Sequence, residues 1–139
     1  MRFTGKSVVI TGATGGLGRA AAQRFYDEGA NIALVDLHQK DIDAFLQTFD
    51  ADSKRIIGIE ADVSKDTDVK NYVEETMATF GRIDTLFNNA GIEGSISSLE
   101  DYEEEIFDRV VQVNIKGVWL GMRYCADAMR KSGGGSIIN

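Results

Sequence analysis

Short apolar runs alternate along the chain with longer stretches in which apolar residues recur at helical spacing. The short runs are rich in Val and Ile and end at polar residues or Gly, as buried strands do. The longer stretches have the pattern of helices that cover one face of a sheet. The pattern predicts five strands, at residues 8–10, 32–35, 56–59, 84–87 and 136–138.

The stretches between these strands predict four helices, at residues 18–28, 41–49, 65–80 and 99–131. Gly29 and Gly81 are expected to end the first and third helices, and Ser64 to be the N-cap of the third. A break in the last helix is expected near residues 114–117, where Asn and Gly interrupt the apolar pattern.

Alternation of strands and helices with short connections predicts an α/β fold with a parallel sheet covered on both faces. The usual doubly wound order gives a Rossmann sheet 3-2-1-4-5, cut off before a sixth strand. We expect residues 1–139 to form one incomplete domain of this Rossmann type.

A glycine-rich turn follows the first strand and opens the first helix. Gly12, Gly16 and Gly18 have the spacing that lets a backbone approach a ligand closely. The free N–H groups and the positive dipole end of the helix would then face a pyrophosphate. A Walker-type ATP site would need Gly-Lys-Ser/Thr here, but the chain has Gly18-Arg19.

Asp36 ends the second strand, 18 residues beyond Gly18. In dinucleotide-binding folds, an acid at this place accepts hydrogen bonds from the adenosine ribose. It would also repel the additional phosphate of NADP, and the next residues, Leu37 and His38, offer no Lys or Arg to offset this. The sequence therefore favours NAD over NADP. A simpler reading is that Asp36 only caps the next helix.

The formal net charge of −7 gives no electrostatic footprint for nucleic acid or anionic membranes. One cysteine, Cys125, and one histidine, His38, cannot form a disulfide or a zinc site of Cys and His ligands. We expect Cys125 to be a small buried apolar residue, no bound metal, and a cytoplasmic protein.

Four motifs follow one another along the chain. They are Thr-Gly-x-x-x-Gly-x-Gly at Thr11–Gly18, Asp62-Val63, Asn88-Asn89-Ala90-Gly91, and Asn114 within Val-Asn-Ile-Lys-Gly. In this order they resemble the motifs of the short-chain dehydrogenase/reductase family. The resemblance covers the whole chain and implies an NAD(H)-dependent oxidoreductase that transfers hydride between nicotinamide and a secondary alcohol or ketone.

This resemblance assigns roles to the residues of the motifs. It implies that Thr14, Gly16 and Leu17 line the pyrophosphate through the backbone of the turn. It also implies that Asp62 bonds the adenine amino group, with the Val63 backbone beside it.

The resemblance further implies that Asn89, Ala90 and Gly91 stabilise their strand and pass close to the cofactor ribose and nicotinamide. A simpler reading is that Asp62 and Asn89 only tie loops to strand ends.

Asn114 lies among apolar residues that we expect to face the core, and a buried amide needs hydrogen-bond partners. In the family that the chain resembles, this residue interrupts the helix and holds a water in a proton relay. Asn114 is thus the expected catalytic residue, and a satisfied structural amide at a helix kink is the alternative.

The family's Tyr-x-x-x-Lys pair does not occur in these 139 residues. In the family, the serine that orients the substrate comes a few residues beyond a stretch like residues 135–139. We therefore expect a cofactor-binding fragment that is inactive alone, from a parent enzyme acting on a small alcohol or ketone as a homo-oligomer. One alternative is a non-catalytic dinucleotide-binding module. Another is a sugar-nucleotide epimerase or dehydratase, because the spacing of Gly12, Gly15 and Gly18 also fits the glycine-rich turn of those enzymes.

Overall fold

The computed structural model describes residues 1–50 and 54–139. Five parallel strands form one sheet in the order β3-β2-β1-β4-β5, as the sequence predicts. Val9 at the centre of the sheet lies opposite Ala33 of β2 and Leu86 of β4. The strands are β1 (Ser7–Thr11), β2 (Asn31–Asp36), β3 (Ile56–Glu60), β4 (Thr85–Phe87) and β5 (Ser136–Ile138).

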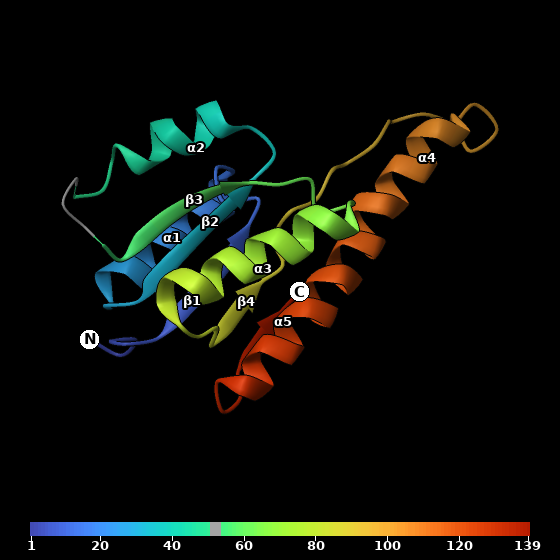
Figure 1. The fold of residues 1–139 in the computed structure, drawn as a ribbon. Coiled ribbons are helices and arrows are strands. Elements are labelled where there is room, and N and C mark those ends of the chain that lie inside the picture. Colours follow the sequence, from blue (N-terminus) through green and yellow to red (C-terminus); the bar gives the residue numbers. More distant parts are fainter. Residues whose placement is uncertain (51–53) are drawn as a thin grey trace.

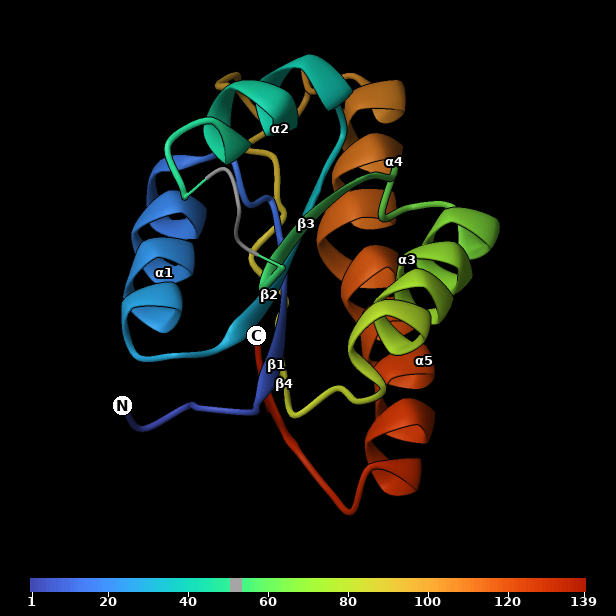
Figure 2. The ribbon, with the colours of Figure 1, turned by 60° about the vertical axis from the view of Figure 1, so that its left-hand side comes forward.

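Helices cover both faces of this sheet (Figures 1 and 2). Helices α1 and α2 lie on one side, and α3 and α5 lie on the other. Helix α4 extends beyond the sheet and continues through a π-helical segment into α5. The helices are α1 (Gly16–Asp27), α2 (Gln39–Leu46), α3 (Asp66–Phe80), α4 (Glu104–Val111), the π-helix η1 (Gln112–Gly117) and α5 (Val118–Lys131).

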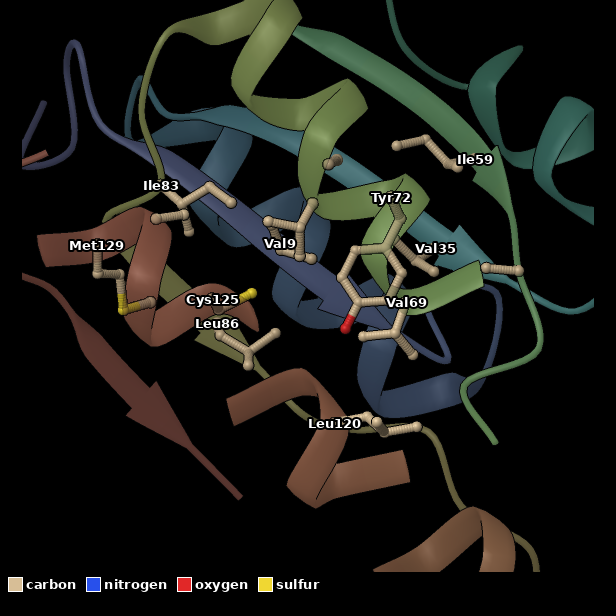
Figure 3. Close-up of a cluster of buried hydrophobic side chains, with 14 residues drawn as sticks. Val9, Val35, Ile59, Val69, Tyr72, Ile83, Leu86, Leu120, Cys125 and Met129 are labelled. Atoms are coloured by element: carbon tan, nitrogen blue, oxygen red, sulfur yellow. The ribbon is translucent and has the colours of Figure 1, made fainter. Parts of the chain in front are cut away.

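The core has two parts because successive side chains of a strand point to opposite faces. Val8 and Ile10 of β1 pack with apolar residues of α1 and α2. Val9, between them, belongs to the other part, which includes Tyr72 of α3 and Leu120 of α5 (Figure 3). All five side chains have at most 1% of their surface exposed. Burial on both faces explains why the central strands β1 and β2 read as continuous apolar runs.

The glycines at the ends of two helices act as predicted. Gly29 has φ of +94° beyond α1, and Gly81 is the left-handed C-cap of α3 with φ of +75°. The break near residues 114–117 is also confirmed, and it has the form of η1. The expected start of the last helix at Leu99 is wrong, because α4 begins at Glu104 and the Leu99 side chain is 91% exposed.

Cys125 is fully buried in the core between α5 and the sheet, as expected. Burial raises the pKa of its thiol to about 12, so the thiolate is scarce at neutral pH. Within the described ranges, no helix is both long and apolar enough to span a membrane. The same residues contain no group of three His, Cys, Asp or Glu side chains placed to hold a metal ion.

Candidate cofactor-binding site

Two adjoining cavities lie where the strands meet their following loops. One, of about 150 Å³, is at the ends of β2, β3 and β4 and extends to α4. The other, of about 460 Å³, lies over the glycine-rich turn. Gly12, Asp36, Ala90 and Gly91 line both. The cofactor-binding residues predicted from sequence that line at least one cavity are Gly12, Thr14, Gly16, Leu17, Asp36, Asp62, Val63, Asn89, Ala90 and Gly91.

The glycine-rich turn is packed tightly at two glycines and open at a third. Gly12 has φ of +63°, and a Cβ there would lie 2.9 Å from Cα of Ala90. A Cβ on Gly18 would collide with the carbonyl oxygen of Gly12, so Gly18 holds α1 against the turn and lines neither cavity. A Cβ on Gly16 would meet nothing within 4 Å. Gly16 begins α1 and faces the second cavity, which leaves the positive end of the helix accessible to an anion.

Asp36 is fixed at the junction of the two cavities by three donors. Its Oδ2 accepts hydrogen bonds from the N–H and the hydroxyl of Thr14, both at 2.8 Å, and its Oδ1 accepts the N–H of Leu37 at 2.8 Å. The alternative that Asp36 caps α2 is wrong. His38 is the N-cap, and the N–H of Gln39 donates to Oε2 of Glu60 at 2.7 Å.

Asp62 follows β3 and shapes the connection to α3. Its Oδ1 accepts hydrogen bonds from the Ser64 hydroxyl at 2.6 Å and the Ser64 N–H at 3.0 Å. The predicted N-cap role of Ser64 is therefore wrong: its hydroxyl donates to Asp62, and Lys65 is the N-cap. Partial burial opposes ionisation of Asp62, but the Ser64 hydrogen bonds and the charges of Lys65 and Arg109 outweigh it and lower its pKa.

Asn89 joins the ends of β1 and β4. Its side-chain amide donates to the carbonyl oxygens of Thr11 at 3.1 Å and Gly12 at 3.0 Å. The N–H groups of Asn89 and Ala90 both donate to the Thr11 hydroxyl at 3.1 Å. These bonds fix the backbone of the Asn-Asn-Ala-Gly loop beside the glycine-rich turn.

Asn114 differs from expectation in its burial. It lies in η1 and is exposed, although Val113 and Gly117 on either side of it are buried. Its side chain is nevertheless satisfied: Oδ1 accepts the N–H of Ile92 at 2.9 Å, and Nδ2 donates to the Ile92 carbonyl at 2.8 Å. The amide thus ties the loop after β4 to the π-helix, and it lines neither cavity.

Sequence reasoning missed five residues of the first cavity, Leu37, Ala61, Ile92, Arg109 and Val113. Leu37 and Ile92 each lie next to a predicted site residue, but an isolated apolar residue in a loop gives little signal. Arg109 lies four positions before Val113, another residue of the cavity, and this spacing places two residues on one helix face.

A parallel sheet of this order, with a glycine-rich turn after β1 and an acid at the end of β2, defines a Rossmann-type nucleotide-binding fold. The profile of a family described as short chain dehydrogenase matches residues 6–139. The chain belongs to the short-chain dehydrogenase family.

Relatives agree with this assignment. Levodione reductase from Leifsonia aquatica is 42% identical over 142 residues, covering 99% of this chain and 52% of that protein. An uncharacterized oxidoreductase from Thermotoga maritima is 39% identical, covering 100% of this chain and 54% of that protein. The chain spans about half the length of the curated relatives it matches.

Solved structures show the same fold. The crystal structure of levodione reductase has a TM-score of 0.92 at 42% identity, and the match covers 99% of this chain and 54% of the levodione reductase chain. The structure of NAD⁺-bound xylitol dehydrogenase has a TM-score of 0.94 at 31% identity, and the match covers 100% of this chain and 54% of the xylitol dehydrogenase chain. Members of the family with this fold thus bind nicotinamide cofactors.

Proposed function

We propose that this chain is the NAD(H)-binding part of an oxidoreductase that interconverts a secondary alcohol and a ketone. The observation that carries the proposal is the Asp36 carboxylate, which is held by Thr14 where the two cavities meet. A carboxylate at this position suits the hydroxyls of an adenosine ribose.

In this proposal the two cavities divide the cofactor between them. Thr14, Gly16 and Leu17, together with Gly12 and Gly18, shape the turn that would receive the pyrophosphate. A chain with a net charge of −7 repels anions in general, so local N–H groups and the helix dipole would supply the attraction.

The cavity beyond Asp36 would hold the adenine, with Asp62 and Val63 at its edge. Asn89, Ala90 and Gly91 would guide the rest of the cofactor along the end of β4. When NAD(H) is held there, its nicotinamide would supply hydride transfer to and from the carbinol carbon of the substrate.

The proton of this reaction needs a separate acid or base. No tyrosine in these 139 residues is followed by lysine four positions later. Asn114 cannot serve alone as this acid or base, because both polar atoms of its side chain already form hydrogen bonds with the backbone of Ile92. We therefore propose that the 139-residue polypeptide by itself binds cofactor without turnover, and that Asn114 supports the relay in the whole enzyme.

The whole enzyme, in our proposal, is a cytoplasmic homo-oligomer that takes a small-molecule alcohol or ketone. The exposed apolar side chains of Phe107, Ile115 and Trp119 along the α4–α5 helix favour self-association. Light scattering over a range of protein concentrations would check this, and a monomer at every concentration would contradict it.

The cofactor proposal is tested by titrating the protein with NADH and with NADPH and following nicotinamide fluorescence. We expect tighter binding of NADH, because Asp36 repels the 2′-phosphate. Asp36→Asn removes this charge and should narrow the preference for NADH over NADPH by about fivefold or more, since one unfavourable charge contact is worth ~1 kcal/mol or more at such a site. Tighter NADPH binding by the unmodified protein would overturn the preference, and binding of neither would overturn the proposed function.

A further inference from the structure

Arg109 is the one basic side chain among the residues that line the cavity at the ends of β2, β3 and β4. It comes from α4, which extends away from the sheet, and it is in none of the family-like motifs (Figure 1). Val113, four residues later in η1, which continues α4, also lines the cavity. Arg109 and Val113 therefore add one wall from the helix to a cavity whose other walls come from strand ends and the loops that follow them.

The guanidinium of Arg109 is not used by the protein itself. Among residues 1–50 and 54–139, it makes no hydrogen bond and no ion pair, although it lies near enough to Asp62 to lower the pKa of that carboxyl. Asp62 takes its hydrogen bonds from Ser64 instead, and Lys65 approaches its other oxygen at 3.8 Å. In a chain of net charge −7, an arginine left unpaired in a cavity that is also lined by Asp36 and Asp62 is available to a ligand.

The rest of the lining indicates which part of a ligand Arg109 meets. Leu37, Ile92 and Val113 give the cavity apolar walls, and Leu37 and Ile92 are 42% and 38% exposed. The turn residues Thr14 and Gly16 line only the other cavity, so a pyrophosphate there would not lie against Arg109. Apolar walls with one planar cation suit a flat aromatic ring better than a phosphate.

We propose that Arg109 covers the adenine ring of the bound dinucleotide, with its planar guanidinium stacked on the base. This inference rests on the proposed function. It adds a cofactor-binding residue from α4 to a site that is otherwise formed by strand ends and loops. Arg109 would hold the adenosine half of the cofactor and leave the nicotinamide half unaffected.

The test compares the dissociation constants of NADH, AMP and reduced nicotinamide mononucleotide, which lacks the adenosine. Arg109→Met keeps the length and apolar stem of the side chain but removes its charge and plane. We expect NADH and AMP to bind about 5- to 10-fold more weakly, the size of one stacked cation on an aromatic ring. Binding of the mononucleotide should change by less than about twofold.

Two further variants make the result specific. Arg130→Met removes one exposed positive charge at the far end of α5 and should leave all three ligands unaffected. Arg109→Lys keeps the charge without the planar group and should bind NADH nearly as weakly as Arg109→Met.

The inference is overturned if Arg109→Met binds NADH as the unmodified protein does, if it weakens the mononucleotide equally, or if lysine restores full affinity. In those cases normal NADH binding by the unmodified protein leaves the proposed function standing. Failure of the unmodified protein to bind NADH overturns both.

Discussion

Thr14 donates its backbone N–H and its hydroxyl to the same oxygen of Asp36, Oδ2, at 2.8 Å each. The two residues lie at the same end of two neighbouring strands: Thr14 is in the turn that follows β1, and Asp36 is the last residue of β2. The pair fixes the direction of the carboxylate at the place where the cavities join. It also links the glycine-rich turn to the acid proposed to hold the ribose.

We predict that Thr14→Val weakens NADH binding by about 3- to 10-fold, because the carboxylate loses a hydrogen bond worth ~1 kcal/mol and turns more freely. Valine keeps the shape of threonine and the backbone N–H bond, so the fold should be retained. Fluorescence titration with NADH measures the change. Thr14→Ser is the matched control and should bind nearly normally, whereas equal loss in both variants would show that the hydroxyl is not responsible.

The two glycines at the start of α1 should respond differently to alanine. Gly18→Ala places a methyl group against the backbone of Gly12 and Ala13, which cannot move aside, and we expect a loss of ~2 kcal/mol or more in the free energy of unfolding. Gly16→Ala has open space and should leave stability unchanged while lowering NADH affinity, because its methyl group enters the second cavity. Urea unfolding and NADH titration separate the two effects, and a stable Gly18→Ala protein would contradict the packing argument.

Asp84 should give the protein acid-sensitive stability. Burial by itself would raise its pKa, but hydrogen bonds from Arg82, the Ser7 N–H and Lys6 outweigh this and lower it to about 2. A carboxyl whose pKa is lower in the folded chain stabilises the fold above its unfolded value near 4. That contribution, roughly 2 kcal/mol, is lost as the pH falls from about 4 to about 2.

We therefore expect Asp84→Asn to unfold at lower urea concentration than the unmodified protein at neutral pH, with the difference shrinking across that acidic range. Asp127→Asn is the control, because Asp127 is 50% exposed in surface ion pairs with Arg130 and Lys131 and should matter little. A difference that stays constant down to pH ~2 would argue against ionisation as the cause.

Asn114→Ala should loosen the loop after β4 without unfolding the protein. Both bonds of the Asn114 side chain go to the backbone of Ile92 in an exposed region, so their loss should cost less than ~1 kcal/mol in global stability. The Ile92 amide should exchange with solvent at least about tenfold faster, as measured by hydrogen exchange and NMR. Gln112→Ala, in the same π-helix, should leave this amide unchanged.

The strands and their order were predictable because the apolar runs of a doubly buried parallel sheet are unambiguous. Helix ends were less so. The predicted second helix, residues 41–49, is Gln39–Leu46, and the apolar pattern continues past it because Phe49 packs on Tyr26 and Phe45 outside the helix. Leu99 also made the predicted helix too long, because an exposed leucine before the helix continues the apolar pattern of the sequence.

The site was predictable wherever a residue type is demanded by backbone geometry or charge. Gly12, Gly18 and Asp36 are of this kind, and the structure brings them together. Asn114 was misjudged because its surroundings along the chain are apolar, whereas its amide points to the backbone of Ile92. The role of the Ser64 hydroxyl as a donor to Asp62 depends on a three-residue turn that spacing alone does not reveal.

The π-helix from Gln112 to Gly117 also sets the angular relation between the two halves of the long helix. A π-turn holds one residue more than an α-turn, so α4 is turned relative to α5 by the angle that one residue spans, about 100°. Deleting one residue here would restore a regular helix and rotate Arg109 away from the strand ends while the packing of α5 stayed as it is. Because of the additional residue, one continuous helix packs against the core through α5 and faces the cavity through α4.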